Sequence, residues 1–129
     1  MSIYGHANAQ YYGNKISFPK ESFTIVGISH YQDYLKDKNN LIITFESKLT
    51  LKLEPDNKYD PEAIQIQFNN NCIGYVPKNP PFYKKICKEQ LDSNLKIITI
   101  KKEKNSDNYG IRVILEKYYS EDLVDKCIF

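Results

Sequence analysis

The chain has 129 residues, of which 41% are hydrophobic and 26% charged, and its formal net charge at pH 7 is +2. This composition excludes a largely disordered or low-complexity chain, and the length predicts one domain with its own core. The apolar runs are far shorter than the roughly 18 residues that suggest a membrane-spanning helix, so we expect no such helix.

The first half of the chain predicts an arm followed by strands. Residues 1–20 carry aromatic side chains among small and polar residues without a steady period, and they predict an irregular N-terminal arm. The β-rich run Phe23–Tyr31 predicts the first strand. An apolar run at Leu41–Phe45 follows, and leucines at alternate positions of 49–53 then predict a half-buried strand.

A turn and a hairpin come next. Two prolines bracket Asn and Asp residues in Pro55–Pro61, so the chain must reverse there. The alternating segments 63–68 and 72–76 flank the polar turn Asn69–Asn71 and predict a β-hairpin.

The second half predicts one helix and a second hairpin. Apolar residues recur at helical spacing in Phe82–Leu91, with lysines opposite them. Leu95–Lys102 and Tyr109–Lys117 alternate around a polar turn. Ser120 can cap a short helix that ends at Val124. The expected organisation is therefore one domain over residues 21–119, with a short helix or tail at 120–129.

Three stretches carry a recognisable motif in order and spacing. Val26-Gly27 lies in the first predicted strand, Leu51–Ile66 contains L-x-L-E-P-D-N-K-Y-D-P-E-A-I-Q-I, and Ile73–Lys78 reads I-G-Y-V-P-K. Together they resemble the HIRAN family, and the length predicts a small free-standing member of it. The resemblance covers about residues 23–91, and its N-x-Y-D-x-x-A-I core is the most specific part.

The resemblance implies a fold and a function. The fold is mainly β with one or two short helices, arranged as a modified OB-like β-barrel. The function is DNA binding with a preference for single strands and exposed 3′ ends, which suits DNA repair. In such a site a terminal base stacks on aromatic rings, an Asp accepts a hydrogen bond from the sugar hydroxyl, and a basic residue meets the phosphate.

The family's binding residues map onto this chain position by position. The matching positions are the aromatic pair His30 and Tyr31, the central Asn57, Tyr59 and Asp60, and Tyr75 and Lys78 after I-G. The chain departs from the pattern at Ser29, where a larger polar residue is common, and at Pro77, which is basic in some members. These departures predict a weaker phosphate contact.

Charge adds a second group of candidates. The segment between Pro77 and Lys104 contains eight lysines and only three acidic residues. Three of these lysines, Lys84, Lys85 and Lys88, lie on the predicted helix, where they could contact phosphates. The alternative is that these lysines only cover a solvated face.

Structural explanations are also open for the motif residues. Tyr31 and Tyr59 could be ordinary strand residues, Asp60 could clamp its own turn, and Asn57 could be structural. Gly27 and Gly74 could permit close strand approach or a bulge.

Other classes of function are less well supported. The three cysteines lack C-x-x-C spacing, and the two histidines are far apart in sequence, so we expect no metal and no cofactor. The start of the chain lacks the features of a secretory signal, which together with the cysteines predicts a cytoplasmic location. No nucleophile–base pair or phosphate-binding glycine loop is recognisable, so we expect no enzyme, and a nuclease using Asp60 and Glu62 is a distant alternative.

The expected partners are single-stranded DNA or DNA ends, with a helicase or nuclease acting in trans. The weak net charge and the acidic residues after Glu116 leave open a different role, as a protein-interaction adaptor or inhibitor that uses the same barrel. The abundance of Lys, Asn and Ile and the single Arg suit a phage or bacterial origin in an AT-rich genome.

Overall fold

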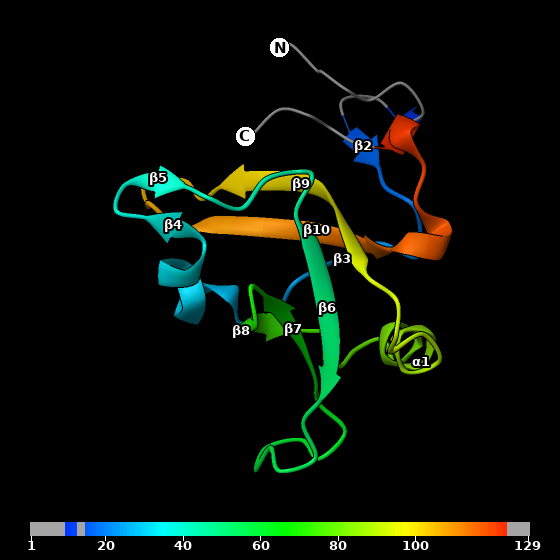
Figure 1. The fold of residues 1–129 in the computed structure, drawn as a ribbon. Helices are drawn as coiled ribbons and strands as arrows, with labels where there is room; N and C mark the ends of the chain where they lie inside the picture. Colours follow the sequence, from blue (N-terminus) through cyan, green and yellow to red (C-terminus); the bar gives the residue numbers. More distant parts are fainter. Residues whose placement is uncertain (1–9, 13–14, 124–129) are drawn as a thin grey trace.

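A computed structural model describes residues 10–12 and 15–123. Its centre is one antiparallel six-stranded sheet that curls strongly on itself, in the order β3-β10-β9-β6-β7-β8 (Figure 1). The strands are β3 (Phe23–Thr24), β6 (Lys48–Leu53), β7 (Ile64–Phe68), β8 (Asn71–Tyr75), β9 (Leu95–Lys102) and β10 (Tyr109–Leu115). The prediction of a mainly β, OB-like barrel is confirmed.

Short helices and small ladders complete the described part of the chain. The helical elements are the α-helix α1 (Phe82–Lys88) and the 3₁₀ segments η1 (Ile28–Tyr34), η2 (Glu116–Tyr118) and η3 (Glu121–Leu123). The separate ladders pair β1 (Gln10–Tyr12) with β2 (Lys15–Ser17), and β4 (Lys36–Asp37) with β5 (Asn40–Leu41). None of the helices in residues 10–12 and 15–123 is long and apolar enough to cross a membrane.

The two edges of the sheet meet at one backbone bridge. Val26, just after β3, and Tyr75, at the end of β8, exchange two N–H···O=C bonds of 2.9 Å. The bridge needs Gly74, whose φ is +151°, because a Cβ at that position would lie 2.4 Å from Ile25 Cγ2. The curled sheet closes at this point, and Gly74 permits the close strand approach that was predicted for it.

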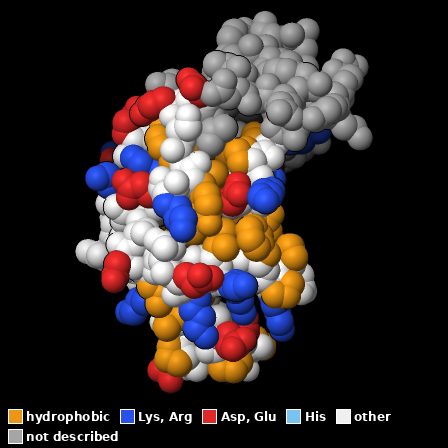
Figure 2. Space-filling model, turned by 90° about the vertical axis from the view of Figure 1, so that its right-hand side faces the viewer, with side chains coloured by type: hydrophobic (Ala, Val, Ile, Leu, Met, Phe, Trp, Pro, Cys, Tyr) orange, Lys and Arg blue, Asp and Glu red, His pale blue; other side chains and the backbone are white. Residues whose placement is uncertain are grey.

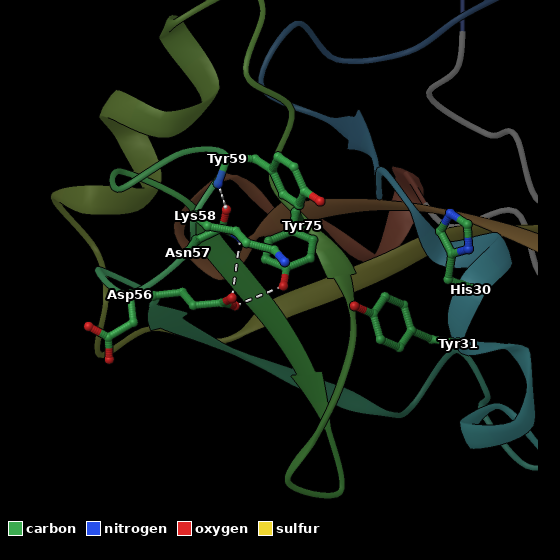
Figure 3. A pocket seen from close by; sticks show the side chains of 8 residues that line it. His30, Tyr31, Asp56, Asn57, Lys58, Tyr59 and Tyr75 are labelled. Atoms are coloured by element: carbon green, nitrogen blue, oxygen red, sulfur yellow. Dashed lines mark hydrogen bonds between the residues drawn. The ribbon is translucent and has the colours of Figure 1, made fainter.

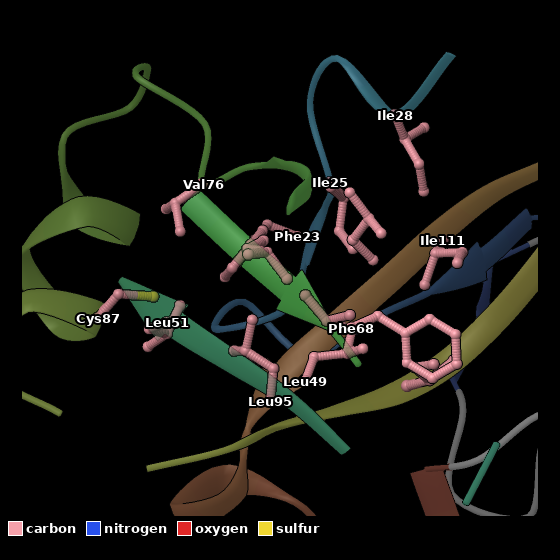
Figure 4. Packing of buried hydrophobic residues seen from close by; sticks show 14 of the residues in the cluster. Phe23, Ile25, Ile28, Leu49, Leu51, Phe68, Val76, Cys87, Leu95 and Ile111 are labelled. Carbon is pink, nitrogen blue, oxygen red and sulfur yellow. The ribbon is translucent and has the colours of Figure 1, made fainter. Parts of the chain in front are cut away.

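The core lies inside the curl (Figure 4), and along β6 and β7 its residues follow a period of two, whereas β9 and β10 also bury consecutive residues. Leu49 and Leu51 of β6 are buried, as are Ile64, Ile66 and Phe68 of β7. β9 and β10 contribute Leu95, Ile97, Ile100, Ile111 and Val113 to the same cluster. Leu53, which the alternation placed in the core, is 41% exposed because β6 ends there and the chain leaves the sheet.

Both predicted hairpins and the predicted helix are confirmed. Asn69 and Asn70 have φ of 51° and 66°, which suits the tight turn between β7 and β8. The helix ends three residues earlier than predicted, at Lys88, and Ile86 and Cys87 are its buried residues. The last strand ends at Leu115, and η2 takes up the two residues that were expected to continue it.

The predicted first strand, Phe23–Tyr31, is wrong beyond its start. Only Phe23–Thr24 forms a strand, and Gly27 turns the chain with a φ of +76° into η1. The segment Ile28–Tyr34 therefore forms two short 3₁₀ turns joined by a kink at Tyr31, whose φ is −127°. In the run Leu41–Phe45, Leu41 ends β5, and Ile43 is buried in a loop.

The two ends of the described chain also differ from a simple arm and tail. The segment expected to be irregular contains the β1–β2 ladder. At the other end, Ser120 Oγ accepts a 3.3 Å bond from the N–H of Asp122, at the start of η3. Val124, the expected end of this helix, lies outside the described residues.

Candidate nucleic-acid interface

Three segments that are far apart in sequence surround one open pocket of about 590 Å³ (Figure 3). They are η1, the loop between β6 and β7 (residues 54–63), and the end of β8. The lining residues are His30, Tyr31, Glu54, Asp56, Asn57, Lys58, Tyr59 and Tyr75. Four of these side chains are aromatic rings, so the pocket offers several flat faces.

Gln32 fixes η1 against the sheet. Its Nε2 donates to the carbonyl oxygens of Ile28 and Tyr109, both at 3.0 Å, and its Oε1 accepts from the N–H of Tyr109 at 2.7 Å. The side chain is buried and pairs with β10 as a neighbouring strand would. Because Tyr31 directly precedes Gln32, this clamp sets where the Tyr31 ring enters the pocket.

Asn57 shapes the loop that carries Tyr59. Its Oδ1 accepts from the N–H groups of Tyr59 and Asp60, both at 2.9 Å, so the structural interpretation of Asn57 is the one that the contacts support. The turn projects the Tyr59 ring outward, where it is 83% exposed. Lys58 Nζ lies 5.5 Å from the centroid of that ring.

Glu54 and the Tyr75 hydroxyl form what we call the pocket floor. Glu54 Oε2 accepts from Tyr75 Oη at 2.8 Å and from Gln65 Nε2 at 2.7 Å, and Glu54 Oε1 accepts from Asn57 Nδ2 at 3.2 Å. Sequence reasoning missed Glu54, although it directly precedes the turn-forming Pro55 within the motif.

Two of the pocket tyrosines, Tyr31 and Tyr75, have raised pKa values. Burial raises the pKa of Tyr75, and its hydrogen bond to Glu54 raises the pKa further, because a carboxylate disfavours a phenolate beside it. Burial also raises the pKa of Tyr31, whose hydroxyl lies toward Tyr75 (Figure 3). Both hydroxyls therefore keep their protons at neutral pH.

A charged group that we call the Asp60 cluster (Asp60, Lys78 and Lys84) lies beside the pocket. Asp60 Oδ2 forms an ion pair with Lys84, and Asp60 Oδ1 accepts from the N–H of Glu62 at 3.0 Å. The hydrogen bond from Lys84 lowers the pKa of Asp60, and Lys78 adds a smaller electrostatic effect in the same direction. Asp60 thus clamps its own turn and remains ionised.

The structure separates the predicted site residues into three groups. His30, Tyr31, Asn57, Tyr59 and Tyr75 line the pocket; Asp60, Lys78 and Lys84 form the adjacent cluster; and Lys85 and Lys88 are exposed on α1. Figure 2 shows basic and acidic side chains intermingled on one face of the molecule, with no continuous basic band across it. Of the three lysines of α1, Lys84 is the one that pairs with Asp60 beside the pocket.

No group of three His, Cys, Asp or Glu side chains in the described part of the chain is placed to hold a metal ion. Cys72 is partly buried and Cys87 is buried, and both are free thiols.

One comparison with known proteins gives a match. The family model for the HIRAN domain matches residues 21–117. This range contains the whole six-stranded sheet and every residue that lines the pocket. No curated protein and no solved structure matches the chain at a significant level.

Proposed function

This chain belongs to the HIRAN domain family, whose members bind nucleic acid, and from that premise we propose that its aromatic pocket holds the unpaired end of a DNA strand. The observation that carries the proposal is the exposed Tyr59 ring at a pocket whose other rings are His30, Tyr31 and Tyr75. Stacking of a base on such a ring contributes about 1–3 kcal/mol and tolerates any base. The pocket volume also lies within the range of about 300–1,000 Å³ that is usual for small-ligand sites.

Stacking on Tyr59 requires an unpaired base, because the faces of bases inside a duplex are covered by their neighbours. We therefore expect a labelled single strand to bind more tightly than the blunt duplex of the same sequence in a fluorescence titration. Affinity should also fall with salt, since phosphate contacts release counterions. Equal affinity for both forms would contradict the proposal. Affinity that does not change with salt would show that phosphate contacts do not contribute to binding.

The Asp60 cluster is the proposed reader of the strand's 3′ end. Asp60 is ionised and can accept a hydrogen bond from a terminal hydroxyl, and Lys78 and Lys84 beside it supply the positive charge that we expect to neutralise the preceding phosphate. A 3′-phosphate removes the donor and adds negative charge beside the Asp60 carboxylate. A hydrogen bond to a charged group is worth about 1.5–3 kcal/mol, and Lys84 offsets part of the repulsion, so we expect about tenfold weaker binding of the phosphorylated end.

The matched pair of oligonucleotides, 3′-hydroxyl and 3′-phosphate, tests this reading together with Asp60→Asn. The Asn oxygen can still accept the Glu62 N–H that holds the turn. Loss of the carboxylate charge should therefore narrow the affinity gap between the two ends while the fold is kept. A wild-type protein that binds both ends equally would refute end recognition and leave single-strand binding to stand by itself.

The proposed role is binding, with no chemical step, and any helicase or nuclease activity is supplied by a partner in trans. Prolonged incubation of a labelled single strand with Mg²⁺ should leave its length unchanged on a denaturing gel. Shortened products that vanish in an Asp60→Asn, Glu62→Gln double variant would contradict this part of the proposal.

A further inference from the structure

The carboxylate of Glu54 has hydrogen-bonding capacity that its protein partners do not fill. An ionised carboxylate offers about four acceptor directions. Oε2 accepts two bonds, from Tyr75 and Gln65, whereas Oε1 accepts one, from Asn57. No other described residue donates to Oε1, so one acceptor direction remains, on a residue that lines the pocket.

The rest of the pocket floor has the same polarity. The only proton of the Tyr75 hydroxyl is committed to Glu54, and the Tyr31 hydroxyl lies toward the same oxygen, so Tyr75 Oη can offer a ligand one lone pair and no proton. The raised pKa of Tyr75 keeps that hydroxyl neutral. The floor therefore presents acceptors, and it favours a ligand group that donates.

Because Tyr59, Tyr75 and Glu54 line the same pocket, we infer that a base stacked on Tyr59 turns an edge toward this floor. Figure 3 shows the Tyr59 ring above Tyr75, whose hydroxyl lies at the end of the dashed line to the carboxylate. The edge of cytosine carries an amino group at C4. The edge of uracil or thymine carries a carbonyl oxygen in the same place, so lone pairs would face lone pairs.

We propose that Glu54 makes the pocket selective for a terminal base with an exocyclic amino group, and that it discriminates against uracil and thymine. This inference rests on the proposed function, because it concerns the base that the same pocket holds. Stacking tolerates every base, whereas a site built to accept a hydrogen bond rejects analogues that lack the donor. Glu54 is thus a specificity-determining residue, and Tyr59 supplies affinity without selection.

Three oligonucleotides that differ only in the 3′-terminal base test the proposal on the wild-type protein. They end in cytosine, in uracil, and in pyrimidin-2-one, which is cytosine with the amino group replaced by hydrogen. Loss of a hydrogen bond to a charged acceptor predicts roughly ten- to hundredfold weaker binding of both analogues than of cytosine. Equal affinity of cytosine and pyrimidin-2-one would overturn the proposal without any variant having to fold.

Glu54→Gln extends the test to the protein, because the amide keeps the shape, removes the charge and replaces one acceptor oxygen with an amino donor. The preference for cytosine over uracil should fall to within about twofold of unity. Glu62→Gln is the matched control, since this exposed carboxylate lies on the same loop but does not line the pocket. Glu62→Gln should keep the wild-type preference for cytosine over uracil. If Glu54→Gln also keeps this preference, another residue selects the base.

The outcomes separate this inference from the function on which it rests. If no terminus binds, whatever its base, then the proposed function fails. If all three termini bind equally well to the wild-type protein, single-strand binding stands and base selection by Glu54 is refuted.

Discussion

Gly74→Ala should be the most damaging small change in this fold, because Gly74 lies where the barrel closes. A Cβ at this position would lie 2.4 Å from Ile25 Cγ2 and 2.7 Å from the carbonyl oxygen of Val26. Ile25 is β-branched and only 2% exposed, so its methyl group cannot rotate away. The Val26 oxygen accepts the N–H of Tyr75 in the closing bridge, so any shift of it breaks that bond.

The expected loss of stability follows from these contacts. Forcing an extra methyl group into a packed core costs about 1–3 kcal/mol. The two bonds of the Val26–Tyr75 bridge contribute about 1 kcal/mol each, and a non-glycine residue at a φ of +151° adds about 1 kcal/mol of strain. Partial relief of one term by another leaves a decrease of about 3–5 kcal/mol in the free energy of unfolding.

Equilibrium unfolding in urea measures this change, with Gly110→Ala as the control. The nearest atom to a Cβ at Gly110 is the oxygen of Lys101 at 3.9 Å, an ordinary contact, so this variant should lie within about 1 kcal/mol of wild type. With a slope of about 2 kcal/mol per molar urea, Gly74→Ala should lower the midpoint by about 2 M. Similar midpoints for the two variants would refute the account of how the barrel closes.

One variant and one labelling experiment test how η1 and α1 pack against the rest of the protein. Gln32→Leu removes the buried clamp and leaves the N–H and C=O of Tyr109 without their partner. The free energy of unfolding should therefore fall by about 2–4 kcal/mol. An unchanged urea midpoint would show that the clamp is dispensable. Burial raises the pKa of Cys87 to about 12, so at pH 8 iodoacetamide should alkylate the partly buried Cys72 before Cys87, as peptide mass spectrometry can show. Faster labelling of Cys87 would place α1 away from the core.

Local patterns in the sequence predicted the elements whose structure depends on near neighbours. Alternation over 63–68 and 72–76 predicted the hairpin, and helical spacing after Pro81 predicted α1. The prediction of a strand over Phe23–Tyr31 was wrong because the left-handed conformation of Gly27 redirects the chain. The burial of Gln32 against β10 then stabilises η1. That contact joins residues 77 positions apart, which no local pattern reveals.

The candidate site divides in the same way. The motif named Tyr31, Tyr59 and Tyr75 as binding residues, and the fold brings all three to one pocket. Glu54 lies within the motif, but sequence reasoning gave it no role, because its importance comes from its hydrogen bonds to Tyr75 and Gln65 across the sheet. Lysine clustering predicted a joint role for Lys84, Lys85 and Lys88; the structure pairs Lys84 with Asp60 and leaves Lys85 and Lys88 exposed on α1.

A single-strand titration of Tyr59→Ala against Tyr34→Ala tests the central claim most directly. Both tyrosines are exposed, Tyr59 at 83% and Tyr34 at 46%, but only Tyr59 lines the pocket, so the two variants lose the same ring in different places. Loss of one stacked base predicts about five- to hundredfold weaker binding for Tyr59→Ala and an unchanged affinity for Tyr34→Ala. Unchanged binding by Tyr59→Ala, in a protein that melts as wild type does, would contradict the assignment of this pocket as the nucleic-acid site.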